Sequence, residues 1–365
     1  MRVWAAGHWI MGDRRKKLLL AGMSILATLL VAEAALRILG IGAVRRGSPW
    51  FAGGNHPRFL FQPDAASGYT LRPGFQGREI AFSNEFDVPV AIDPRGIREH
   101  PHTAGPRPAV LTLGDSITFG EGVPADHTWS AVLERESGVR VYNGGVPGYS
   151  TCQMAGRARS LIPRFRPDLV LVTFSSQWDR NRCDTPFLYM EGYIVSQRYL
   201  ERLHLVGDNL YLGETRLPGI GAATAWAKHH SYLARLALPP LGDAARFLVR
   251  KPVKPFRPSP EDYEPTARAL ASIRHQAQQA GAGFAAILIE SRGRDYEIDR
   301  ANLEKVLRQR GLPYLALDTL RADWKRLRYP RDQHWNDAGH RVVGTALVPL
   351  VRSRLHSSAR PRGET

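Results

Sequence analysis

The stretch AVLTLGDSITFGEGV, residues 109–123, decides the fold class that this sequence predicts. It begins with the apolar run AVLTL (109–113), which is typical of a buried strand. Gly114 then marks a turn, and Ser116 stands at the exit of the strand with Asp115 beside it. A serine at the carboxyl end of a strand is where an open α/β sheet presents a nucleophile.

A second motif supplies the base and the acid that a serine nucleophile needs. RDQHWNDAGH (331–340) contains His334 two positions after Asp332. A serine attacks an ester only when a base takes its proton, and an acid orients that base. Alone, the first motif is also compatible with a simple turn, and the second with a helix N-terminus. Together and in this order, they predict Ser116 as nucleophile, His334 as base and Asp332 as orienting acid.

Strand and helix patterns alternate regularly from residue 108 onward. Such alternation predicts an α/β fold, in which a central parallel sheet of about five strands carries helices on both faces. The expected strands are 109–113, 139–143, 168–174, 283–289 and 313–317, and the expected helices are about 127–136, 152–162, 260–280 and 298–310. A final helix follows Asn336, where apolar residues recur on one face.

Two segments precede or interrupt this pattern. Residues 45–107 are rich in Gly and Pro and predict a linker followed by accessory strands. Residues 185–258 are too long for a plain loop, so we interpret them as a partly helical insertion over the carboxyl end of the sheet. Loops at that end of a sheet shape substrate pockets, so the insertion is expected to line the pocket. The alternative is that it is a packing appendage without a role in binding. We therefore expect the main domain to span 108–355 and residues 356–365 to be a disordered tail.

The N-terminus predicts a membrane or export signal. A basic segment (1–17) ends in Arg-Arg-Lys-Lys and precedes the apolar run LLLAGMSILATLLVA (18–32). A basic flank of this kind keeps the N-terminus in the cytoplasm and directs the chain beyond the apolar run across the membrane. We expect a signal anchor over residues 18–44, a single pass through the cytoplasmic membrane, with the main domain on the periplasmic side. Cleavage at the Ala32-Glu33-Ala34 pattern is the alternative.

Charge and cysteine content limit the classes of partner. The net charge is +16, but the basic residues are spread along the chain, and no nucleic-acid-binding motif accompanies them. We therefore expect no nucleic-acid partner, and the basic surface suits anionic lipid or an acidic polysaccharide. No metal-ligand spacing stands out, so we expect no metal and no cofactor. Cys152 and Cys183 follow two different strands at the same sheet end, and they either pair in an oxidising compartment or stay separate thiols.

Ester hydrolysis also needs hydrogen-bond donors for the oxyanion. The backbone amide of Ser116 is one candidate. The loop NGGVPGYST (143–151) comes after the second strand, and Gly145 and Gly148 allow its backbone to approach a ligand closely. A third donor is expected in SSQWDRNR (175–182), which comes after the third strand.

These motifs resemble, in the same order, those of the SGNH/GDSL hydrolase family, a group of serine esterases and lipases with a flavodoxin-like sheet. GDSITFGEGV resembles the first block of the family, with the nucleophile at Ser116, and RDQHWNDAGH resembles the last block, with the acid and the base. NGGVPGYST resembles the second block, where a glycine amide is an oxyanion donor, and the spacing favours Gly148. The resemblance extends over residues 68–350 and implies a flavodoxin-like three-layer α/β sandwich.

The third block departs from the family pattern, which reads Gly-x-Asn-Asp and uses the asparagine as an oxyanion donor. Here the stretch is SSQWDR (175–180), where Asp179 matches the closing Asp and Trp178 stands in place of the Asn. The side chains of Gln177, Trp178 and Asn181 can each donate a hydrogen bond. Losing one such donor costs about 2.7–4 kcal/mol in comparable sites, so the rate and the substrate class depend on the residue that stands there.

Three functions are compatible with this sequence. The first is a membrane-anchored serine hydrolase that cleaves a carboxylic ester of a small molecule, a cell-envelope glycan or a lipid. The second is an O-acyltransferase acting on a cell-envelope polysaccharide, because DQHWN resembles the Asp-x-His-Trp of alginate-acetylation proteins and the same triad serves both reactions. The third is a binding protein with a decayed oxyanion hole, which the missing asparagine suggests.

Overall fold

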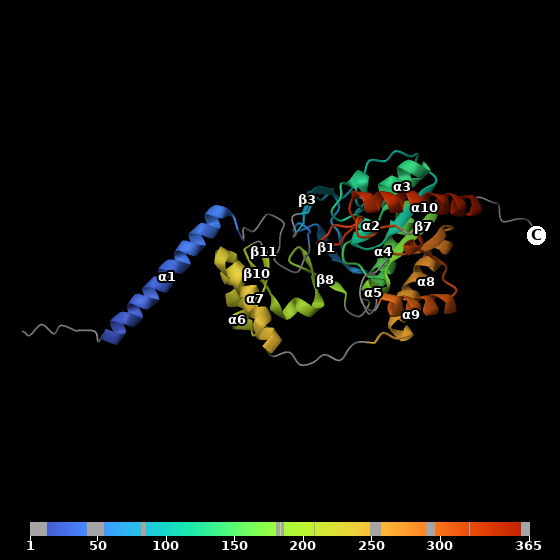
Figure 1. Cartoon of the computed structure of the whole chain (residues 1–365). Helices are drawn as coiled ribbons and strands as arrows, with labels where there is room; N and C mark the ends of the chain where they lie inside the picture. Colours follow the sequence, from blue (N-terminus) through green and yellow to red (C-terminus); the bar gives the residue numbers. More distant parts are fainter. Residues whose placement is uncertain are drawn as a thin grey trace, which may run out of the picture. The chain divides into compact units, whose positions relative to one another are not determined.

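The computed structural model describes residues 13–41, 55–81, 85–179, 183, 186–207, 209–248, 257–289, 296–320 and 322–358. The chain divides into two compact units. The larger unit combines Arg46–Glu201 with Pro252–Thr365, and the smaller unit combines Met1–Arg45 with Arg202–Lys251 (Figure 1).

A sheet of five parallel strands forms the centre of the larger unit, in the order β13–β12–β7–β5–β6. The strands are β5 (Ala109–Leu113), β6 (Arg140–Asn143), β7 (Leu169–Phe174), β12 (Gly283–Leu288) and β13 (Tyr314–Ala316). Their apolar residues are the ones that the hydrophobic runs indicated. The predicted α/β fold with a parallel five-stranded sheet is therefore confirmed.

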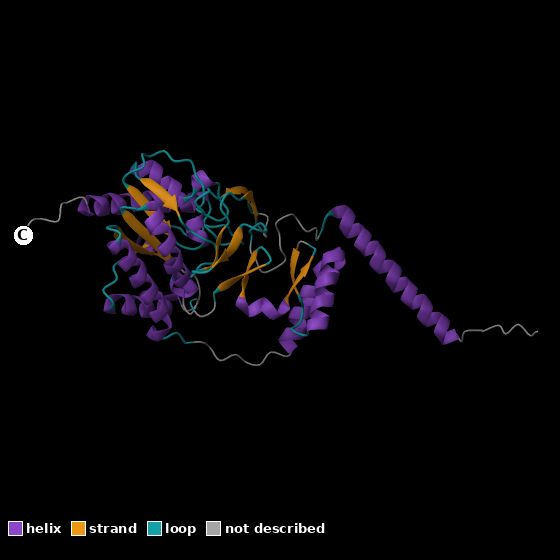
Figure 2. Cartoon of the chain, turned by 180° about the vertical axis from the view of Figure 1, so that it is seen from behind, coloured by secondary structure: helices purple, strands orange, loops and turns teal. Residues whose placement is uncertain are grey.

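Helices cover both faces of this sheet, so the larger unit has three layers (Figure 2). One face packs against α3 (Trp129–Ser137) and α10 (Asp337–Ser358). The other face packs against α4 (Thr151–Phe165), α8 (Glu264–Gln279) and α9 (Tyr296–Gln309). Successive side chains of β5 point into the two cores in turn, as the pleat of a strand requires: Val110 into the first and Leu111 into the second.

The strand order places a switch point at the carboxyl end of β5. From β5 the chain passes first to β6 on one side and then to β7 on the other. The loops that follow these strands therefore diverge around the end of β5. In open α/β sheets this is where ligands bind.

Short hairpins from two parts of the chain complete the larger unit. They are formed by β1 (Phe61–Asp64) with β2 (Gly68–Leu71), β3 (Gln76–Ile80) with β4 (Asp87–Ala91), and β8 (Phe187–Met190) with β9 (Tyr193–Ser196). Single 3-10 turns lie at Ala125–His127, Gln197–Arg202, Pro260–Tyr263 and Leu317–Leu320. The hydroxyl of Tyr69 in β2 donates to the Pro147 carbonyl at 2.8 Å, so the first hairpin contacts the loop after β6.

The smaller unit holds the N-terminal helix and part of the expected insertion. Helix α1 (Asp13–Leu39) includes Arg15–Leu39, which is long and apolar enough to cross a membrane. The helix thus starts before the expected residue 18, and residues 42–44 lie outside the described part. The unit also contains β10 (Leu203–Val206), β11 (Asn209–Leu212), α6 (Pro218–His230) and α7 (Tyr232–Leu248).

Candidate active site

Ser116 is the first residue of α2 (Ser116–Phe119), a single helical turn that follows the buried strand β5. Gly114 allows this sharp exit, because a Cβ at that position would overlap two threonine side chains. Asp115 caps the turn, and its carboxylate accepts a hydrogen bond from the Ile117 amide at 2.9 Å. The local sequence therefore fixes the Ser116 hydroxyl at the carboxyl end of the sheet, as the motif predicted.

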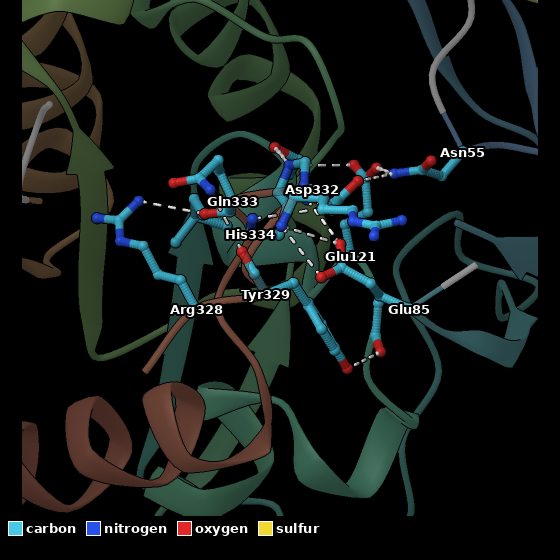
Figure 3. A network of polar contacts seen from close by, with 12 residues as sticks. Asn55, Glu85, Glu121, Arg328, Tyr329, Asp332, Gln333 and His334 are labelled. Atoms are coloured by element: carbon cyan, nitrogen blue, oxygen red, sulfur yellow. Dashed lines mark hydrogen bonds and ion pairs between the residues drawn. The ribbon is translucent and has the colours of Figure 1, made fainter. Parts of the chain in front are cut away.

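The loop before α10 brings the acid and the base to this serine. Gln333, between them, has a φ of 76°, a left-handed conformation that few non-glycine residues adopt. His334 Nδ1 lies 2.5 Å from Asp332 Oδ1, and His334 Nε2 lies 2.9 Å from Ser116 Oγ. Figure 3 shows Asp332 and His334 side by side within a network of polar contacts. Carboxylate, imidazole and hydroxyl thus succeed one another in the order that base-assisted attack needs.

Three hydrogen bonds hold this loop in place. The Asp332 amide donates to Glu85 Oε2 at 2.8 Å, and the Tyr329 amide donates to the His334 carbonyl at 2.9 Å (Figure 3). The Tyr329 hydroxyl reaches the segment after α2, where it donates to the Gly122 carbonyl at 2.9 Å. The loop that carries the base is therefore bonded to the segment just after the nucleophile.

A buried carboxylate that no motif indicated also lies at the site. Glu121 is 3% exposed, and its Oε2 lies 3.4 Å from His334 Nε2 and 3.2 Å from His56 Nε2. The Asn55 amide bridges the two carboxylates, because Nδ2 lies 2.6 Å from Glu121 Oε1 and 2.7 Å from Asp332 Oδ2 (Figure 3). Asn55 and His56 belong to the segment interpreted as linker and accessory strands, where no motif or spacing indicates a site.

The network continues inward from His56. Its Nδ1 lies 2.9 Å from Glu79 Oε1, and Glu79 Oε2 lies 3.5 Å from Arg98 Nη1. Arg98 is itself buried and donates to the Gly120 carbonyl at 3.1 Å and to the Val123 carbonyl at 2.7 Å. Imidazoles and carboxylates therefore alternate from His334 inward. The network ends at the guanidinium of Arg98, which is bonded to the backbone on either side of Glu121.

These charges set the pKa values of the site. Burial by itself lowers the pKa of His334, but the Glu121 charge and the hydrogen bond and charge of Asp332 outweigh it and raise the pKa to about 9. Burial likewise opposes protonation of His56, yet Glu121 and Glu79 raise its pKa to about 10. Conversely, burial raises the pKa of Glu121, and the two histidines more than offset this, so that the pKa falls to about 2. The neutral, basic form of His334 therefore becomes abundant only toward alkaline pH.

Two of the predicted oxyanion donors are available. Within the part of the chain that the structure describes, no group accepts a hydrogen bond from the Ser116 amide, as expected for the first residue of a helix. The same holds, among the described residues, for the amide of Gly148, which has a φ of 77°. A Cβ at Gly148 would lie 2.8 Å from the Tyr69 hydroxyl, so glycine is required for space as well as conformation.

Gly145 differs from the prediction. Its amide donates to Asn143 Oδ1 at 3.1 Å, so this donor is already used. A Cβ at Gly145 would overlap the backbone of α2 near Phe119. The glycine therefore lets the loop after β6 pack against the helical turn that carries Ser116, and its contribution is to packing.

Trp178 also differs from the prediction, because its indole Nε1 donates to the Tyr149 carbonyl at 3.1 Å. It lies in the short helix α5 (Ser176–Asp179), and the ring stacks on Phe187. The Asp179 carboxylate accepts from the amide of Thr151 at 2.8 Å and thereby ties α5 to the start of α4. The side chain of Gln177 and the whole of Asn181 lie outside the described residues.

Among the residues that the structure describes, two groups of side chains have the donor atoms of a metal site within 4.8 Å of one another. The first is Glu121, Asp332 and His334, which make the contacts described above. The second is His100, His102 and Glu134. Glu134 Oε2 also accepts from the Val141 amide at 2.9 Å, and Oε1 accepts from the amides of residues 103 and 104 at 2.7 and 3.0 Å. The carboxylate is thus satisfied by the chain itself and holds the 100–104 segment against α3.

Cys152 and Cys183 form a disulfide with a Cα–Cα distance of 5.4 Å. The sequence left open whether these cysteines pair. The bond joins the first turn of α4 to the segment after α5. Helix α4 follows the loop that carries Gly148, and Cys183 follows the helix that carries Trp178, so the disulfide links the two parts of the chain that hold these residues.

Comparison with known proteins finds one family match and one related enzyme. Residues 112–205 match the model of the GDSL-like Lipase/Acylhydrolase family. A segment of 68 residues, 17% of the chain, is 35% identical to an arylesterase from Vibrio mimicus. That segment spans 34% of the arylesterase, so the chain matches about a third of this relative's length.

Two solved structures are similar over a larger share of the chain. A lipolytic protein of the G-D-S-L family from Desulfitobacterium hafniense is 12% identical, with a TM-score of 0.38, over 67% of this chain and 99% of its own. A lipase/acylhydrolase from Enterococcus faecalis is 13% identical, with a TM-score of 0.38, over 70% of this chain and 99% of its own.

Proposed function

Because residues 112–205 match the GDSL-like Lipase/Acylhydrolase family, we propose that the chain hydrolyses carboxylic esters, with Ser116 as nucleophile, His334 as base and Asp332 as orienting acid. One observation carries this proposal: the 2.9 Å contact between His334 Nε2 and Ser116 Oγ. A decayed site would hold the imidazole away from the hydroxyl, so this contact argues against a mere binding protein.

Each step of hydrolysis has a residue in reach. His334 Nε2 takes the Ser116 proton as Oγ attacks the ester carbonyl carbon, and Asp332 stabilises the imidazolium that forms. The amides of Ser116 and Gly148 donate to the oxyanion. His334 then returns the proton to the leaving alcohol, which leaves an acyl group on Ser116. Water, activated by the same imidazole, releases the acid and restores the serine.

We also propose that α1 is a retained anchor that places the larger unit on the periplasmic side of the cytoplasmic membrane. The length and apolar character of Arg15–Leu39 support this, as does the basic flank before it. The disulfide of Cys152 and Cys183 suits an oxidising compartment. The substrate would then be an ester of the cell envelope, carried by a glycan or a lipid.

The hydrolysis proposal is tested on the full-length protein in detergent. Wild type should react with a fluorophosphonate probe and hydrolyse short acyl esters, and Ser116→Ala should abolish both while the circular dichroism spectrum is unchanged. Ser160→Ala, on the exposed side of α4, is the matched control and should keep full activity. Probe labelling that persists in Ser116→Ala, or a wild type without esterase activity, would contradict the proposal.

Two further measurements test the remaining parts. Product analysis with an acetyl donor and a polysaccharide acceptor separates hydrolysis, which releases free acetate, from transfer to a sugar hydroxyl. Carbonate extraction and the intact mass of the mature chain test the anchor. The full mass and resistance to extraction are expected, whereas a chain shortened near Ala34 would show a cleaved signal.

A further inference from the structure

Helix α6 in the smaller unit has two faces that differ in their surroundings. One face packs on the β10–β11 hairpin and includes Ala225, which is fully buried. The opposite face exposes Ile220 at 55% and Trp226 at 60%, together with Ala223 between them. Solvent-facing sides of helices ordinarily carry charged residues, yet residues 217–227, LPGIGAATAWA, contain none.

Helix α7 also exposes large apolar side chains. Leu241 is 64% exposed and Leu236 is also exposed, within the uncharged stretch LALPPLG (236–242). We call the exposed apolar residues of the α6–α7 helical hairpin, with Leu217 just before it, the hairpin face; its members are Leu217, Ile220, Ala223, Trp226, Leu236 and Leu241. Contiguous apolar patches on a protein surface mark contacts with a partner or a membrane.

The junction of these two helices is bonded to α1. Glu33 accepts hydrogen bonds from the amides of Tyr232 at 3.0 Å and Leu233 at 2.9 Å, at the N-terminus of α7. Arg37 donates to the carbonyl of His230 at 2.6 Å, at the C-terminus of α6. Each charge thus meets the helix end of opposite partial charge. The two charged residues just after the apolar run of α1 are therefore used to hold the α6–α7 turn.

The position of this junction along α1 sets its depth in a membrane. The uncharged residues 18–32 form about 22 Å of helix, less than the roughly 30 Å of a bilayer core. Glu33 comes directly after this run, so the α6–α7 turn lies at its outer end. Trp226 is a residue type that favours the membrane interface.

From these observations we propose that the hairpin face of α6 and α7 lies among the lipids of the leaflet at the C-terminal end of α1. The proposal rests on the membrane anchor proposed above. The α6–α7 helical hairpin would act as an interfacial element whose apolar side chains enter the boundary between headgroups and acyl chains. The proposal also explains why two charged residues, Glu33 and Arg37, follow the apolar run of α1 at the membrane edge.

The test uses the full-length protein in vesicles that contain phosphatidylglycerol. Ile220→Cys and Ala223→Cys each receive an environment-sensitive thiol dye, since both native cysteines are held in the disulfide. Arg159→Cys, on an exposed position of α4, is the control. Replacing the lipids with brominated lipids should quench both hairpin labels at least twofold and leave the α4 label unchanged.

Carbonate extraction of the same samples separates this proposal from the anchor. If every variant is extracted, the anchor fails, and the hairpin proposal fails with it. If the chains resist extraction while bromolipids leave labels 220 and 223 bright, the anchor stands and the docking of the hairpin is refuted. If those labels are shielded from iodide but not quenched by bromolipids, another protein covers the face, which also refutes lipid docking.

Discussion

At the scale of single residues, Glu121 distinguishes the chemistry of this site. Its carboxylate lies between two imidazoles, that of the proposed base His334 and that of His56. The pair Glu121 and Asp332 shares the Asn55 amide, so two negative groups face one base. Two nearby carboxylates stabilise protonated His334 more than a single orienting acid would. His334 therefore loses its proton only at high pH.

We expect the pH profile of hydrolysis to report this arrangement. Because neutral His334 is the proposed base and its pKa is raised to about 9, kcat/KM should rise with pH and level off above about pH 9. Glu121→Gln removes a close negative charge, so the rising limb should move to lower pH by about one unit or more. The measurement is kcat/KM of an acyl ester between pH 6 and 10.

Two controls make this prediction specific. Glu136→Gln, which replaces an exposed carboxylate of α3, should leave the limb in place. Glu121→Asp should return the limb toward the wild-type pH because it restores the charge. A limb that stays near pH 9 in Glu121→Gln would show that Glu121 has only a structural role.

At the same scale, the motif residues and the network residues were not equally predictable. Ser116, His334 and Asp332 stand in motifs whose residue types already imply acid–base chemistry. Glu121 is in the first motif too, but an isolated glutamate after a glycine has no spacing partner that reveals a role. Asn55 and His56 are separated from Asp332 by more than two hundred residues, and only folding brings them within hydrogen-bond distance of the site.

At the scale of elements, the site depends on how the loops after β6 and β7 are held. Asp179 accepts from the Thr151 amide, and the disulfide of Cys152 and Cys183 joins the same two regions. Gly145 packs on α2, while Gly148 keeps its amide free among the described residues. The two glycines of one motif therefore have different functions, because only one of them meets an internal acceptor.

We expect the disulfide to stabilise the larger unit. The two cysteines are 31 positions apart, and closing a loop of this length contributes about 3–4 kcal/mol in the chain-entropy model. The double variant Cys152→Ser with Cys183→Ser should lose about 2–4 kcal/mol of unfolding free energy. Urea unfolding in detergent, without reductant, measures this loss.

Reduction of the wild type provides the internal control. Wild type treated with reductant should match the double variant, and the double variant itself should be insensitive to reductant. Equal stability of wild type and double variant without reductant would contradict the role of the bond.

For the whole molecule, the buried charges couple stability to pH. His56 and His334 have pKa values raised to about 10 and about 9, above the ordinary value of 6.5. Their stabilising contributions are complete below pH 6.5 and are lost as the pH rises through 9 and 10. His340 has a pKa lowered to about 3 by burial, so its contribution is constant above pH 6.5 and does not counter this trend.

The free energy of unfolding should therefore fall between pH 6.5 and pH 10. Urea unfolding of the detergent-solubilised protein across this range measures the slope. His56→Gln should be less stable at pH 6.5 and should show a shallower decline, because one of the two titrating groups is gone. His356→Gln, at the exposed end of α10, should reproduce the wild-type slope. If the free energy of unfolding of the wild type does not change with pH, the buried histidines are not protonated at pH 6.5 in the folded protein.

The sequence by itself determined the parallel sheet, since β5 and β7 read as apolar runs that only a doubly covered sheet can bury. It also predicted the residues of the proposed triad, because their residue types and their order in the two motifs imply acid–base chemistry. Only the tertiary structure decided which donors remain open, which carboxylate accompanies the base, and that part of the insertion belongs with α1. These depend on contacts between residues far apart in the chain, and such contacts leave no local pattern of period or spacing.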